Sequence, residues 1–251
     1  MHAICIKTRV IKQGRGDFLI ICKKNLVILS FVTYNVWDVT GRRFAYGKEY
    51  GMNYNIILAS GSPRRKEILS QIGARYEVIV SDCDESTPLT EPGELVKELS
   101  CRKAMAVAET VPGPAVVIGA DTVVAYNGTI LGKPKDRADA RRMISMLSGN
   151  THQVYTGVSL IIKEETGENS AVSFAECSEV SVDSMTDCQI EEYLDTNEGA
   201  DKAGSYAVQG IFAAHIKGIK GDYYNIVGLP VAAIYKKLYD MGIDLKTGKK
   251  F

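Results

Sequence analysis

Clusters of cysteine and histidine are missing from this 251-residue sequence. The six cysteines form no C-x-x-C pair and follow no regular spacing, and only three histidines are present. A disulfide framework and a zinc-type site are therefore disfavoured. Free thiols in a reducing compartment, the cytoplasm, are expected instead. The isolated His152 and His215 are expected to be hydrogen-bonded structural residues.

Long apolar runs and a net charge are also missing. No apolar run reaches the roughly 18 to 20 residues of a membrane-spanning helix. Thirty basic and thirty acidic residues cancel, so net charge gives no support for binding to nucleic acid or to a membrane. With 45% hydrophobic and 24% charged residues, the composition is that of a soluble globular protein whose length suffices for one large domain or two small ones.

The first 51 residues differ from the rest in charge. They contain nine Lys or Arg and three Asp or Glu, whereas the other 200 residues contain 21 and 27. Two apolar runs, Phe18–Cys22 and Leu26–Val32, resemble a poor signal peptide, but no small-x-small cleavage site follows them, so secretion is not expected. Met52 precedes the regular pattern and is a plausible start. Residues 1–51 are therefore interpreted as an upstream translation artefact or as a weakly ordered, non-catalytic extension.

A strand, a tight loop and a helix are predicted around residues 56–69. The apolar run Ile56–Leu58 ends in small residues, Ser62 stands at the expected N-cap and Pro63 at the first helical position. Two arginines and a lysine follow, and cations are disfavoured at a helix N-terminus unless an anion binds among them. A polyphosphate would fit, although a surface helix with solvated arginines is an equal alternative. The spacing is neither Gly-x-x-x-x-Gly-Lys nor Gly-x-Gly-x-x-Gly.

A carboxylate interrupts the most apolar strand of the sequence. Residues 115–124 are continuously apolar apart from Asp121 and Thr122, which predicts a central, doubly covered strand. A buried Asp121 needs a cation or donors beside it. Asn127-Gly128 predicts a hairpin turn that returns Lys133 toward Asp121.

The remaining pattern alternates strands and helices. Strands are expected at 76–80, 153–162, 171–182 and 213–219, and helices at 92–110, 136–148, 186–194 and 230–241, with an acidic loop at 82–88, an αL glycine at Gly149 and a frayed tail after Asp244.

Cations, carboxylates and one amide recur at the predicted strand ends and loops. Magnesium prefers one or two carboxylates together with phosphate oxygens and waters, so this set suits a magnesium-bound polyphosphate. Asp121 could also act as a general base that orients water. The set consists of Arg64, Arg65, Lys103, Lys133, Glu85, Asp121 and Gln209.

Seven short motifs, in order between residues 55 and 241, resemble those of the Maf family of nucleoside triphosphate pyrophosphatases. They are Ser60–Arg65, Gly119–Thr122, Gly132–Pro134, Ser148–His152, Asp201–Gly204, Val208–Gly210 and Val227–Pro230. The resemblance covers residues 52–251 as one domain. It implies a mixed α/β fold, similar to inosine triphosphate pyrophosphatases, with an elongated, curved central sheet flanked by helices and a cleft between two lobes. A homodimer is also implied.

The resemblance further implies hydrolysis of a nucleoside triphosphate to monophosphate and pyrophosphate with a divalent metal, Mg²⁺ or Mn²⁺. Asp121 matches the proton acceptor, and Glu85 matches an acidic residue that assists with metal or water. Asp121 and Glu85 are thus the expected metal ligands. The implied substrate-binding residues are Ser60, Ser62, Arg64, Arg65 and Lys103. Lys133 is implied to be a triphosphate-binding cation and, with Asp121 and Glu85, a catalytic residue.

Substrate preference is also implied by the resemblance. Arg64, Thr122 and Gln209 match the group acting on dTTP and UTP rather than the group acting on 7-methyl-GTP, and modified pyrimidine nucleotides are further candidates. An amide such as Gln209 can both donate to and accept from the O4/N3 edge of a pyrimidine. Two alternatives stay open: a nucleotide-binding regulator of septum formation with little turnover, and an enzyme that hydrolyses inosine or xanthosine triphosphates.

Overall fold

The computed structural model describes residues 9–12, 18–21, 36–37, 43–44, 53–166 and 168–251. Contacts between Cα atoms divide the chain into two units, Met1–Tyr50 and Gly51–Phe251. In the first unit, β1 (Arg9–Lys12) pairs with β2 (Phe18–Ile21), and β3 (Val36–Trp37) pairs with β4 (Arg43–Phe44), both antiparallel. The predicted apolar run at 26–32 and the proposed start at Met52 lie outside the described residues.

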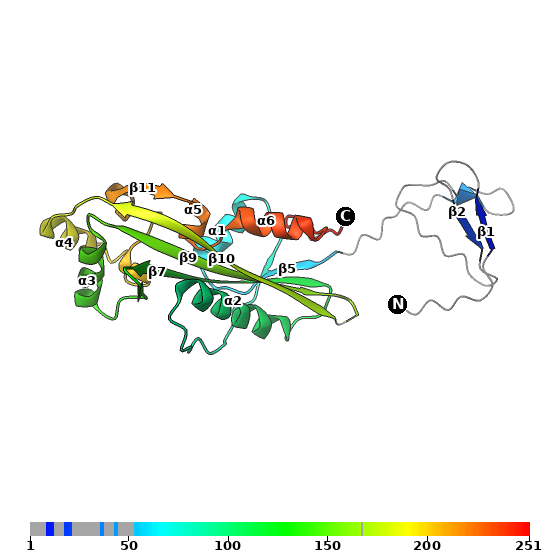
Figure 1. The fold of residues 1–251 in the computed structure, drawn as a ribbon, viewed down its shortest axis with the longest axis horizontal. Helices are drawn as coiled ribbons and strands as arrows, with labels where there is room; N and C mark the ends of the chain where they lie inside the picture. The colour runs from blue at the N-terminus through cyan, green and yellow to red at the C-terminus, as the bar shows by residue number, and fades with distance from the viewer. Residues whose placement is uncertain (1–8, 13–17, 22–35, 38–42, 45–52, 167) are drawn as a thin grey trace. The chain divides into compact units, whose positions relative to one another are not determined.

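The second unit is built on a seven-stranded mixed sheet, as predicted (Figure 1). The strand order is β11-β10-β9-β7-β5-β6, and β8 pairs with β7. β5 is parallel to both β6 and β7, and the other pairs are antiparallel. The strands are β5 (Asn55–Leu58), β6 (Glu77–Val78), β7 (Ala115–Tyr126), β8 (Thr129–Leu131), β9 (Thr151–Lys163), β10 (Asn169–Val182) and β11 (Ile216–Lys220).

The predicted helices are present in the second unit. Thr186 caps α4 with a capping box, and Gly149, just after α3, has φ 71° as expected for an αL residue. The helices are α1 (Pro63–Gln71), α2 (Pro92–Ala108), α3 (Arg137–Leu147), α4 (Asp187–Asp195), α5 (Tyr223–Val227) and α6 (Val231–Asp240), with 3-10 turns η1 (Ala203–Ser205) and η2 (Ile211–His215).

Three expectations about individual segments were wrong. The strand predicted from Ala213 begins at Ile216, because the preceding residues form η2, where Phe212 is fully buried. The strand expected at 76–80 is reduced to β6. The tail after Asp244 is docked: Leu245 is fully buried, and Gly248 accepts a hydrogen bond from the Tyr54 amide at 2.8 Å.

The strands β5 and β7 are continuously apolar because both faces of the sheet are covered there. Leu58 and Ile118 face a core formed with α1 and α6, and Ile57 and Val117 face a core formed with α2. The helix α2 packs unusually close to the sheet. A Cβ on Gly157 would lie 2.1 Å from a backbone oxygen of α2, so only glycine fits there.

A separate core lies at the other end of the sheet, where α3 and α4 pack together (Figure 1). It contains Val124 of β7, Ile144 of α3 and Tyr193 of α4. The long strands β7, β9 and β10 run through both regions. The unit therefore has two lobes on one sheet, as predicted. Among the described helices, none is long and apolar enough to span a membrane.

An interruption in strand pairing lies between the two lobes. β5 pairs with β7 up to Ile118, and β8 pairs with β7 from Val124 onward. Among the described strands, none pairs with residues 119–123 along that edge of β7. The sheet thus opens at Asp121 and Thr122.

Candidate functional site

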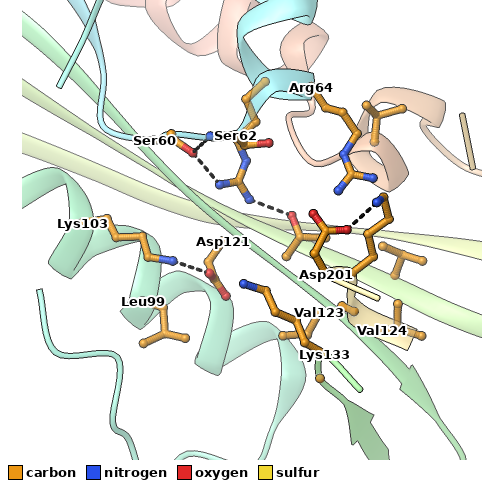
Figure 2. Close-up of a pocket in the computed structure, with 18 of the residues that line it drawn as sticks. Ser60, Ser62, Arg64, Leu99, Lys103, Asp121, Val123, Val124, Lys133 and Asp201 are labelled. Carbon is orange, nitrogen blue, oxygen red and sulfur yellow. Dashed lines mark hydrogen bonds and ion pairs between the residues drawn. The ribbon is translucent and has the colours of Figure 1, made fainter. Parts of the chain in front are cut away.

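A cavity of about 670 Å³ lies at this opening and is lined by both lobes (Figure 2). Nine of the ten predicted site residues line it. Gln209 is exposed and does not line the cavity, whereas Tyr206 and Val208, just before it, do. A contact between Gln209 and a nucleotide base therefore stays a prediction. The nine lining residues are Ser60, Ser62, Arg64, Arg65, Glu85, Lys103, Asp121, Thr122 and Lys133.

Asp121 has the cationic partner that its burial requires. Its side chain is 13% exposed, and Oδ1 lies 2.6 Å from Nζ of Lys103 on α2. The same ammonium lies 3.2 Å from Oε1 of Glu85. One cation thus holds two carboxylates together, and a low local dielectric strengthens this interaction compared with one in water.

Arg65 joins three segments around the cavity. Its Nε donates to the Gly228 carbonyl at 2.8 Å, Nη1 to Oγ of Ser60 at 3.0 Å, and Nη2 to Oγ1 of Thr122 at 3.1 Å. Burial lowers the pKa of this guanidinium, and the charge of Asp121 opposes that shift. A guanidinium has five N–H donors, so two remain for a ligand.

The Thr122 hydroxyl is committed to a directed chain of hydrogen bonds. Oγ1 of Thr156 donates its one proton to the Asn225 carbonyl at 2.8 Å. The 2.9 Å bond between the two threonine hydroxyls must therefore be donated by Thr122, which also accepts from Arg65. Thr122 has no second proton to give to a substrate and acts here as a link between Arg65 and the sheet.

Ser62 occupies the N-cap position of α1, but its side chain makes no capping hydrogen bond. The neighbouring Ser60 organises the loop instead: its Oγ accepts from the Ser62 amide at 3.3 Å and from Arg65. Pro63 stands at the start of the helix as expected. The predicted N-cap residue is therefore confirmed, although the side-chain hydrogen bonds of this loop are made by Ser60 and not by Ser62.

Two charged residues of the cavity were not among the predicted site residues. Asp201 and Lys202 line it and pair with each other, and Nζ of Lys202 also donates to the Glu198 carbonyl. The hydrogen bond from Lys202, and to a lesser extent the charge of Arg64, lowers the pKa of Asp201. The signal in the sequence that could have identified these two residues is a pair of adjacent opposite charges just before a glycine-rich tract.

The donor set fits a divalent metal that also binds phosphate. Among residues 53–166 and 168–251, no group of three or more His, Cys, Asp and Glu could hold a metal. Asp121 and Glu85, however, both contact one ammonium, so a single cation can engage both. Mg²⁺ typically uses one or two carboxylates together with phosphate oxygens and waters.

His152 lies behind the cavity and is structural, as predicted. It is fully buried, and its Nε2 lies 2.8 Å from the hydroxyl of Tyr206, a lining residue. Burial lowers the pKa of His152 to about 4. Of the six cysteines, the four within the described residues, Cys83, Cys101, Cys177 and Cys188, are free.

Comparison with known proteins gives consistent matches. A family model described as Maf-like protein matches residues 55–241. A dTTP/UTP pyrophosphatase of Lachnoclostridium phytofermentans is 52% identical over 192 residues, covering 76% of this chain and 98% of the relative. Proteins of the same name from Agathobacter rectalis and Bacillus cytotoxicus are 50% and 48% identical over 202 and 189 residues, covering 76% and 74% of this chain and 98% and 96% of the relatives.

Proposed function

The chain belongs to the Maf family, and from this premise we propose that it hydrolyses dTTP and UTP to the monophosphate and pyrophosphate. The observation that carries the proposal is the placement of Asp121 against Lys103 in a strongly cationic cavity. The relatives named dTTP/UTP pyrophosphatase supply the substrate class.

The charge of the cavity suits a triphosphate. Its lining has five cationic side chains and three carboxylates, an excess of positive charge that complements a polyanion. Guanidinium and ammonium groups bind phosphate oxygens by charge-assisted hydrogen bonds. The cations are Arg64, Arg65, Lys103, Lys133 and Lys202, and the carboxylates are Glu85, Asp121 and Asp201.

Asp121 acts as the proton acceptor in this proposal. Lys103 engages Oδ1, so Oδ2 can accept a proton from a water molecule. The water oxygen forms a bond to the α-phosphorus while the bond from that phosphorus to the bridging oxygen breaks, and pyrophosphate leaves. The cations stabilise the charge that develops on the phosphate oxygens. A divalent metal held by Asp121 and Glu85 supplies further positive charge to the same oxygens when bound.

Part of the cavity lining is apolar and suits a pyrimidine base. Val124, Tyr206 and Val208 belong to one core cluster and line the cavity together, and such a surface binds a planar ring without selecting its polar edge. Selection for dTTP and UTP is therefore assigned to the polar residues Arg64, Thr122 and Gln209. Thr122 takes part through its bond to Arg65.

The alternative function is a nucleotide-binding regulator of septum formation with little turnover. The pairing of Asp121 with Lys103, together with the names of the relatives, favours turnover. We also propose a cytoplasmic homodimer that uses Mg²⁺ or Mn²⁺ and does not act on nucleic acid.

Pyrophosphate release from dTTP, UTP, CTP, GTP and 7-methyl-GTP, measured with Mg²⁺ and with Mn²⁺, tests the proposal. Faster release from dTTP and UTP is the expected result. Preference for another base would retain the reaction but contradict the substrate assignment. Nucleotide binding without pyrophosphate release would favour the regulator instead.

A further inference from the structure

Glu85 reaches the cavity from a segment with no helix or strand. Residues 79–91 connect β6 with α2 without regular secondary structure. The Glu85 side chain is 59% exposed, yet its Oε1 lies 3.2 Å from Nζ of Lys103. An exposed ion pair contributes little by itself, because holding two long side chains costs conformational entropy. Other contacts must therefore fix this segment for Glu85 to stay in place.

Arg102 supplies these contacts on both sides of Glu85. Its Nη1 donates to the Ser86 carbonyl at 2.8 Å and to the Asp84 carbonyl at 3.3 Å. Glu85 is the residue between these two carbonyls. The fork formed by Nε and Nη1 contacts Glu98 and both carbonyls at once, which the single ammonium of a lysine does not reproduce.

The guanidinium and the turn it binds are each held by further hydrogen bonds. Nε of Arg102 donates to Oε1 of Glu98, one helical turn earlier on α2, at 2.8 Å. The Ser86 amide donates to Oδ1 of Asp84 at 2.8 Å, and the Ser86 hydroxyl donates to the same oxygen. These bonds lower the pKa of Asp84. Hydrogen bonds thus hold both the turn at residues 84–86 and the Arg102 side chain that contacts it.

Arg102 and Lys103 are consecutive residues of α2. Arg102 binds the backbone of the turn, and Lys103 binds the carboxylate of the turn's central residue together with Asp121. The turn is therefore attached to α2 at two adjacent points, one of which belongs to the catalytic cavity.

We propose that Arg102 is a positioning residue that holds Glu85 beside Lys103 and Asp121. The inference rests on the proposed function only for the role of Glu85 in turnover. The contacts between Arg102 and the turn do not depend on that role.

A double-mutant cycle in the full chain tests the coupling. Arg102→Gln is expected to lower kcat/KM for dTTP on the order of tenfold, because small misplacements of catalytic groups are costly. If Arg102 acts through Glu85, the double variant with Glu85→Gln is no slower than Glu85→Gln alone. Arg102→Lys keeps the charge but not the fork, and is expected to recover little of the loss. If the losses in kcat/KM of the two single variants add up in the double variant, the proposal is overturned.

A control separates positioning from general stability. Arg142→Gln removes a similar helix-surface ion pair, with Asp139 on α3, away from the turn. It is expected to keep wild-type kcat/KM.

Hydrogen exchange gives a readout that needs no turnover. Arg102→Gln is expected to speed amide exchange across residues 84–88, and Arg142→Gln is not. Unchanged exchange in Arg102→Gln would overturn the proposal. If the wild type releases no pyrophosphate, the proposed function fails, and exchange still decides whether Arg102 holds the turn.

Discussion

At the scale of single residues, Asp121 and Thr122 are adjacent on β7 but make their contacts on opposite faces of the strand. Successive side chains of a strand point to opposite faces. Asp121 meets Lys103 of α2, and Thr122 meets Arg65 of α1. Because strand pairing is interrupted at this point of β7, side chains on both faces of the strand line one cavity. The carboxylate proposed for proton transfer and the hydroxyl that holds Arg65 thus come from adjacent positions.

The first prediction concerns Asp121. Asp121→Asn removes the proposed proton acceptor and leaves the Lys103 ammonium without its closest carboxylate, 2.6 Å away. Turnover of dTTP is expected to fall on the order of 10²- to 10⁴-fold, the range for a general base. Steady-state pyrophosphate release measures it, with circular dichroism as a check on folding. A folded variant with near-normal turnover would contradict the assignment of Asp121.

At the scale of elements, a chain of hydrogen bonds connects α1, β7, β9 and α5. It runs from Arg65 through Thr122 and Thr156 to the Asn225 carbonyl. Thr156 is fully buried and does not line the cavity. Its hydroxyl accepts one bond and donates another. The orientation of Arg65, the proposed phosphate ligand, therefore depends on a residue behind the cavity.

Thr156→Val tests this dependence, because valine has nearly the same shape and no hydroxyl. Two hydrogen bonds are lost, although the Thr122 hydroxyl still accepts from Arg65 and the Asn225 carbonyl still accepts from the Gly228 amide. At about 1 kcal/mol for each bond lost, the unfolding free energy is expected to fall by about 1 to 3 kcal/mol. KM for dTTP is expected to rise by a larger factor than kcat falls, since Arg65 is proposed to bind the triphosphate. Urea unfolding and steady-state kinetics measure the two effects.

Thr156→Ser is the matched rescue, because it keeps the hydroxyl, and it should restore KM. Thr110→Val is a control: Thr110 also donates to a backbone carbonyl, that of Val107, but lies outside the cavity lining. A KM that stays unchanged in Thr156→Val would argue against the link.

At the scale of the whole molecule, burial of His152 couples folding to pH. The folded-state pKa is about 4, below the ordinary value of 6.5. Between these values the unfolded chain binds a proton that the folded chain does not. The contribution of His152 to stability is therefore complete above pH 6.5 and is lost as the pH falls toward 4, by about 3 kcal/mol in all.

Removal of the imidazole should flatten that pH dependence. The wild-type unfolding free energy is expected to fall from pH 7 to pH 5, and His152→Gln should lose less over the same interval, although it is less stable at pH 7 because the contact with Tyr206 is changed. Urea unfolding at several pH values measures both. Parallel pH profiles for the two proteins would contradict this role of His152.

The division of the chain into two units leads to a prediction about residues 1–51. The boundary between the units lies at Tyr50 and Gly51, and the family match begins at residue 55. A protein comprising residues 52–251 is expected to fold and to retain dTTP turnover. Size-exclusion chromatography and pyrophosphate release check this expectation. Loss of the soluble fold would show that the first residues are required.

Local pattern was sufficient for most elements and most cavity residues. Pro63 and Pro92 mark the first residues of α1 and α2, and Thr186 marks the start of α4 through its capping box, because these signals act over a few residues. Asp121 was identifiable because a carboxylate within an apolar strand requires a partner. The motifs contain seven of the nine predicted residues that the fold brings together, and the resemblance to the family supplied the other two, Glu85 and Lys103.

Tertiary contacts decided the remainder. Leu245 docks the C-terminal tail, and Phe212 lies against Tyr193 and Tyr206 with ring centroids 4.9 Å apart, contacts between residues distant in sequence that periodicity does not encode. Arg65 and Thr156 acquire their roles only when α1, β7, β9 and α5 meet. Local sequence pattern is thus sufficient to predict most elements, the family and the side chains available for chemistry. Which of these side chains share a hydrogen bond depends on distances in space, and those distances are set by the fold.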